Sequence, residues 1–151
     1  MPDIEDILFN DFRLEKCSKC GWARLPYFRL ENFVLHYMQR KNFCNSKKAD
    51  SIADLSDEDK KVALAFLDEL DVKKWNARKP SPKIFCSFCS DELIELIPPS
   101  LKSFKMYSCG YCGSLYFKTQ DIEKALEHFM RRAKRKQGLL WLLKKWIEGL
   151  F

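Results

Sequence analysis

Four cysteines in two Cys-x-x-Cys pairs constrain the fold of this chain more than any other feature. Cys86 and Cys89 form the first pair, and Cys109 and Cys112 form the second, with nineteen residues between the two pairs. A pair on a tight turn directs both sulfurs at one ion, and two such turns complete the tetrahedral shell that Zn²⁺ prefers. The spacing therefore predicts a zinc site. The alternative is that the four cysteines are inert core residues.

Short segments rich in aromatic and branched residues lie between and after these pairs, and they predict strands at 92–97, 104–108 and 114–117. Gly113 follows the second pair and supplies the positive φ that such a turn needs, whereas Ser90 holds this place after the first pair. Residues 84–118 therefore resemble the zinc-ribbon family. The resemblance implies a ribbon that binds nucleic acid or docks onto other proteins, often in the transcription machinery.

A second group of candidate ligands precedes the ribbon and consists of Cys17, Cys20, His36 and Cys44. Residues 29–41 show helical periodicity and carry the histidine. Positions eight apart on a straight helix are separated by about 12 Å. The helix must therefore end near Lys41 for the last cysteine to join the site.

This order of ligands resembles a CCHC-type variant of the small zinc-finger fold, which implies a second Zn²⁺. The alternatives are that His36 is a core or surface residue and that Cys44 is a small buried hydrophobe. The two sites together would use all seven cysteines and one of the two histidines. This count favours metal over disulfides.

The chain shows no catalytic motif. A shell of four protein ligands leaves no position for a catalytic water, and the sequence has no nucleophile–base pair or glycine-rich phosphate loop. We therefore expect that the protein is not an enzyme. Residues 1–6 are acidic where a signal peptide is basic, and no apolar run is long enough to span a membrane, so we expect an intracellular protein of the cytoplasm or nucleus.

Charge is arranged in blocks along the chain, whose net charge is +6. Lys and Arg dominate residues 17–48, and Asp and Glu dominate residues 49–71. Within the acidic block, Ser56 can cap a helix whose first turn carries three carboxylates. The pattern predicts an α+β protein of two zinc modules, divided into a finger-like module (1–50), a helical connector (51–79), a zinc ribbon (80–118) and a helical end (119–151).

The helical end begins with a basic amphipathic helix over residues 119–138. Five of the six residues 131–136 are basic, and a row of cations falls opposite the apolar stripe. Such a row can neutralise phosphates, although it can also be a solvated helix face. Our first hypothesis is therefore a regulatory or transcription-associated protein that binds DNA or RNA through Arg40, Lys41, Lys47, Lys48, Lys124, Arg131, Arg132 and Arg135.

Gly138 separates this helix from a last segment, residues 139–151, in which large apolar residues fill half of a helical wheel. The first expectation is that this segment packs into the protein's own core. A dimer or partner groove comes next, and an anionic membrane surface comes last. The alternative function is an adaptor or an inhibitor, such as a viral one, that binds a protein such as RNA polymerase through the ribbon and through Trp141, Trp146 and Leu150.

Overall fold

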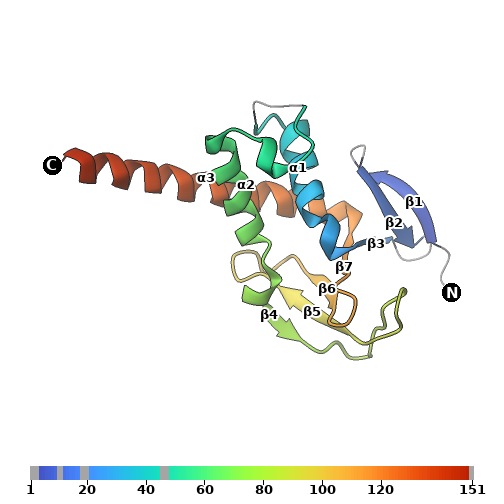
Figure 1. Ribbon diagram of the computed structural model, residues 1–151. Helices are drawn as coiled ribbons and strands as arrows, with labels where there is room; N and C mark the ends of the chain where they lie inside the picture. The colour runs from blue at the N-terminus through green and yellow to red at the C-terminus, as the bar shows by residue number, and fades with distance from the viewer. Residues whose placement is uncertain (1–3, 10–11, 18–20, 45–47, 150–151) are drawn as a thin grey trace.

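A mixed fold of helices and one antiparallel sheet is seen in the computed structural model, which describes residues 4–9, 12–17, 21–44 and 48–149 (Figure 1). The predicted α+β class is confirmed. In the described part of the chain the sheet has seven strands. Their spatial order is β1 (Ile4–Phe9), β2 (Phe12–Cys17), β3 (Trp22–Leu25), β7 (Leu115–Lys118), β6 (Met106–Cys109), β5 (Leu93–Ile97) and β4 (Asn76–Arg78).

The pairing of β3 with β7 joins segments that are far apart in the sequence. Trp22 lies opposite Lys118, and Leu25 lies opposite Leu115. One sheet therefore runs through both of the segments that were expected to form separate zinc modules. The three strands predicted around the cysteine pairs are β5, β6 and β7.

Three helices lie against the sheet, with short 3₁₀ turns at Tyr27–Arg29, Ile52–Asp54 and Val72–Lys74. They are α1 (Leu30–Arg40), α2 (Asp57–Glu69) and α3 (Thr119–Gly149). The predicted helix start at Ser56 is confirmed, because its hydroxyl accepts a hydrogen bond from the Asp59 N–H at 3.2 Å. After α1, Asn42 adopts a left-handed φ of 58° and turns the chain back.

The main core lies between the three helices and one face of the sheet. The predicted apolar stripe of α3 is confirmed: Ile122, Ala125, Leu126, Phe129 and Ala133 are all buried. Aromatic rings pack around it, with Phe129 5.6 Å from Trp75 and Phe66 of α2 5.7 Å from Tyr37 of α1, measured between ring centroids. Residues of the sheet, such as Phe117, form the side of the core opposite the helices.

The break predicted at Gly138 is wrong, because α3 runs without interruption from Thr119 to Gly149. One glycine inside a helix costs about 1 kcal/mol, and the good helix formers on either side outweigh this cost. The expectation that residues 139–149 pack into the protein's own core is also wrong. The buried residues of α3 end at Ala133, and Figure 1 shows the C-terminal half of the helix projecting from the body.

The large apolar side chains of this projecting part are all about half exposed or more. Their exposed fractions range from 49% for Ile147 to 65% for Trp146. Leu150 lies outside the described residues. A search of the described helices found none with the length and apolar character needed to cross a bilayer.

Candidate metal centre and nucleic-acid interface

Both cysteine pairs of the predicted ribbon lie on turns of the same kind. The N–H of Ser90 donates to the carbonyl of Cys86 at 2.9 Å, and the N–H of Gly113 donates to the carbonyl of Cys109 at 2.9 Å. Ser90 has a φ of 67° and Gly113 a φ of 73°. The first turn therefore adopts, with a serine, the left-handed conformation that the second turn adopts with a glycine.

These turns bring all four sulfur atoms together. The Sγ atoms of Cys86 and Cys112 are 3.6 Å apart, those of Cys89 and Cys109 are 3.2 Å apart, and all four lie within 4.8 Å of one another. No other group of three or more such ligands was found in the part of the chain that the structure describes. The predicted cluster is confirmed as a set of four cysteines that could hold a metal ion.

The thiols of the second pair differ in their protonation. Burial raises the pKa of Cys109 to about 12. Burial also acts to raise the pKa of Cys112, but hydrogen bonding with Ser114, whose Oγ lies 3.1 Å from the Cys112 Sγ, lowers it to about 6. Ser114 itself accepts a hydrogen bond from Arg24 Nε at 2.9 Å. A thiolate, the form that binds metal, is therefore already favoured at Cys112.

Tyr116 of β7 supports the first pair from outside the cluster. Its hydroxyl lies 3.0 Å from the Sγ of Cys86 and accepts a hydrogen bond from the backbone N–H of Ser87 at 3.2 Å. Burial raises the pKa of Tyr116 to about 12, so the hydroxyl keeps its proton near neutral pH. Such groups fix the orientation of metal ligands.

The N-terminal candidate site is not formed by its described residues. The N–H of Gly21 donates to the Cys17 carbonyl at 2.9 Å, and Gly21 has a φ of 74°. Cys20 lies outside the described residues. The rings of His36 and Phe12 lie 5.7 Å apart. Phe12 and Cys17 lie at opposite ends of β2, so they are separated by about 16 Å.

Cys44, the last of these predicted ligands, is buried among the apolar residues of the main core. The structure therefore does not bring Cys17, His36 and Cys44 to one point. The physical reason is that His36 and Cys44 lie on the helix-covered side of the sheet, whereas Cys17 lies at the far end of β2 from Phe12.

The predicted phosphate-binding cations fall into two groups. Lys124, Arg131 and Arg135 are exposed on one side of α3, and none of the ion pairs among the described residues includes them. Arg40 and Lys48 are also exposed, whereas Lys47 lies outside the described residues. The first three therefore form an open row, which we call the α3 cation row.

The second group is engaged within the fold. Arg132 Nε contacts Glu69 Oε2 at 3.0 Å, and Lys41 Nζ contacts Glu123 Oε1 at 2.7 Å. Only 6% of the Glu69 side chain is exposed, and Lys136 Nζ lies 2.5 Å from Glu69 Oε1. A buried carboxylate needs such partners, so Arg132 holds α3 against α2.

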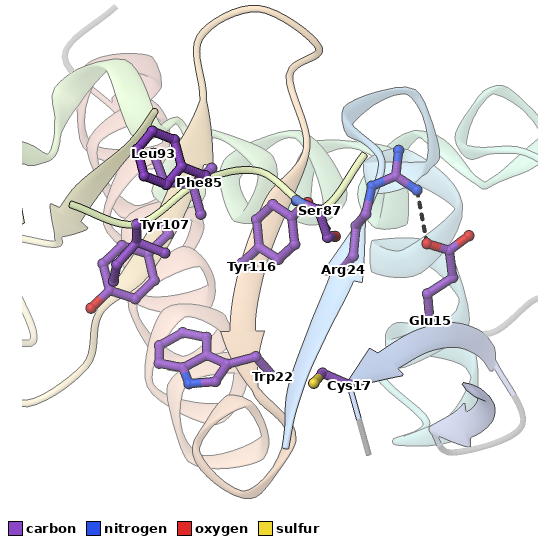
Figure 2. A pocket seen from close by; sticks show the side chains of 10 residues that line it. Glu15, Cys17, Trp22, Arg24, Phe85, Ser87, Leu93, Tyr107 and Tyr116 are labelled. Carbon is purple, nitrogen blue, oxygen red and sulfur yellow. Dashed lines mark hydrogen bonds and ion pairs between the residues drawn. The ribbon is translucent and has the colours of Figure 1, made fainter. Parts of the chain in front are cut away.

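Sequence analysis missed a cavity of about 200 Å³ beside the cysteine cluster (Figure 2). Its walls are mostly aromatic, and the rings of Trp22 and Tyr107 lie 4.9 Å apart. Arg24 and Glu15 form an ion pair at its edge, with a distance of 2.9 Å. The sequence does show aromatic and apolar residues alternating along several short strands, which is a signal for such a cavity. It does not show which strands are neighbours.

Comparison with protein-family models, curated proteins and solved structures found no match to a family model and no significant match in the other two. What this chain does must therefore be argued from its own geometry and chemistry.

Proposed function

We propose that this chain is a zinc-stabilised protein that binds nucleic acid, with a regulatory or transcription-associated role. The observation that carries the proposal is the α3 cation row, together with the net charge of +6. Lys124 and Arg135 are eleven residues apart, which corresponds to about 16 Å along the helix axis. A row of this length spans the rise of about five base pairs of B-DNA.

The four-cysteine cluster supports Zn²⁺ as the ion. A tetrahedral ion with Zn–S bonds of about 2.3 Å needs sulfur atoms about 3.8 Å apart. The distances of 3.6 Å and 3.2 Å in the cluster require only small movements of the turns. When bound, four thiolates fill the coordination shell, so the ion would stabilise the turns rather than activate water.

Neutralising the α3 cation row should reduce the salt dependence of binding. We expect the triple variant Lys124→Gln, Arg131→Gln, Arg135→Gln to make the negative slope of log K against log salt shallower by about 3. Each phosphate contact contributes about 0.9 to the size of this slope. The measurement is fluorescence anisotropy of a labelled duplex between about 50 and 300 mM KCl.

The matched control changes three exposed lysines elsewhere to glutamine: Lys73, Lys79 and Lys102. It alters the net charge equally, so its slope should stay near that of the wild type. Equal slopes for the triple variant and the wild type would show that the row does not contact phosphates. If the slope became equally shallow in both triple variants, the effect would come from the overall charge of the protein and not from the α3 cation row.

A second candidate function is docking to a protein partner through the projecting end of α3, residues 139–149. Patches of exposed apolar residues of this kind mark interaction surfaces. Lys144 and Lys145 border the apolar face, and the basic residues 131–136 precede it. This charge favours a partner whose apolar groove has an acidic rim, and it disfavours a second copy of the same basic helix.

The variant Leu142→Lys should weaken such docking without affecting the fold, because Leu142 is 58% exposed. A central anchor in an interface contributes 2 kcal/mol or more, so the affinity for a purified partner, identified by pull-down, should fall about 30-fold. Leu64→Lys, at a residue that is 56% exposed on α2, is the matched control.

Light scattering of the wild-type protein alone tests the choice of partner. We expect a monomer. A dimer that Leu142→Lys dissociates and Leu64→Lys leaves intact would show that the partner is a second copy of this chain, not an acidic protein. Equal affinities of the two variants for the purified partner would contradict docking through α3.

A further inference from the structure

The register of the sheet separates two faces of different chemistry. Ala23, Leu25 and Phe117 point into the main core, where Phe33 of α1 packs 6.1 Å from Phe117. Successive residues of a strand point to opposite faces. Trp22 and its partner Lys118 therefore point away from the helices.

The same alternation extends this second face over three neighbouring strands. Arg24 of β3 lies opposite Tyr116 of β7, and Tyr116 lies opposite Tyr107 of β6. The result is an aromatic surface on the side of the sheet that the helices leave uncovered. The loop of the first cysteine pair lies over part of it and contributes Phe85 and Ser87 to the cavity.

The cavity between these groups has the size and shape for a single ring system. Figure 2 shows the rings of Trp22, Tyr107 and Tyr116 around one space, with Phe85 on one side and Arg24 on the other. Its volume of about 200 Å³ is below the range of about 300–1,000 Å³ that is typical for drug-sized ligands. Flat aromatic walls favour a planar group that stacks on them.

The charges around the cavity decide which planar group fits. Lys118 Nζ lies 5.6 Å from the centroid of the Trp22 ring, and Lys105 Nζ lies 5.9 Å from that of Tyr107. Among the described residues that line the cavity, Glu15 is the only carboxylate, and Arg24 neutralises it. Cations at the rim repel an ammonium group and attract a planar group that is joined to a phosphate.

We infer that this cavity binds one nucleobase of a single-stranded nucleic acid, stacked against the aromatic wall that Trp22, Tyr107 and Tyr116 form, with the adjoining phosphates near Lys105 and Lys118. A base can enter such a cavity only when it is unstacked and unpaired, so the site would select single strands over duplexes. The inference rests on the proposed nucleic-acid-binding function and names the form of nucleic acid that this face would take.

The test compares a labelled single-stranded oligonucleotide with a duplex of the same length, by fluorescence anisotropy. Loss of one stacked base should weaken single-strand binding by about 5- to 150-fold in Trp22→Leu, while duplex binding stays within about twofold. Trp141→Leu is the matched control, since this tryptophan is 59% exposed on the projecting end of α3. It should bind both forms as the wild type does.

Two other measurements keep the test decisive. If Trp22→Leu fails to fold by circular dichroism, the rim variant Lys105→Gln, Lys118→Gln replaces it and should weaken single-strand binding more than duplex binding. In addition, titration with a mononucleotide should shift the NMR signal of the Trp22 indole N–H, and no shift would contradict a base in the cavity.

Failure of the inference differs from failure of the proposed function. If the wild type binds duplex with a steep salt dependence and the Trp22 or rim variants leave the single-strand preference unchanged, the cavity is not a base site, but the proposed function stands. If the wild type binds neither form at low salt, both are overturned.

Discussion

Substitution Cys109→Ser is expected to release the ion that we propose the cysteine cluster holds, and to unfold the two cysteine turns while the helical core stays folded. The apolar cluster around these turns is small, with Leu93, Tyr107 and Tyr116 as its buried members beside the cysteines. Structural Zn²⁺ contributes about 10–16 kcal/mol in zinc-finger peptides, so the turns should not persist without it. Native mass spectrometry would count the ions, and hydrogen exchange would locate the loss of protection.

Cys44→Ala is the control for this prediction, since Cys44 is buried in the main core and lies apart from the cluster. This variant should retain the ion of the cluster. A Cys109→Ser protein that keeps both its metal and its exchange protection would contradict the metal centre. Two ions per wild-type chain would support the N-terminal site, whereas one ion would leave Cys17, His36 and Cys44 as ordinary residues.

The substitution Phe129→Ala should cost about 3–5 kcal/mol of unfolding free energy. Phe129 is fully buried, and its ring lies 5.6 Å from that of Trp75 and 6.4 Å from that of Phe104. Packing against both rings limits the collapse of the cavity, so the cost should lie within this range. For a chain of this length the Tm should fall by about 6–20 °C.

The exposed Phe28 provides a matched control, because 83% of its surface is accessible. Phe28→Ala should change the unfolding free energy by about 0.5 kcal/mol or less. Urea unfolding of both variants, followed by circular dichroism, makes the comparison. Similar losses in the two variants would contradict a core centred on α3.

The helices could be predicted well because their signals are local. The Ser56 cap and the stripe that includes Phe129 each depend on residues within one to four turns of a helix. The cysteine turns were predictable for the same reason, since a pair and the residue after it determine the local geometry. The end of α3 was mispredicted, because the cost of Gly138 is small beside the propensity of its neighbours.

What could not be predicted depends on contacts between distant segments. Strands β1 to β3 were not anticipated, and β7, one of the two partners of β3, lies about ninety residues away in sequence. The sequence shows that Arg132 is charged, but it does not show that Glu69 is buried beside it. The aromatic cavity likewise exists only because β3, β7 and β6 are neighbours in this order.

The pairing of β3 with β7 also sets the order in which this protein can fold. During synthesis, β3 leaves the ribosome long before Leu115–Lys118 exists, so one edge of the N-terminal strands stays without its partner. An open strand edge is a site of aggregation until it is covered. Closure must wait until Leu115–Lys118 has been synthesised, and contacts of such high sequence separation form slowly. A nascent chain that stalls before residue 115 would therefore be the form most in need of a chaperone.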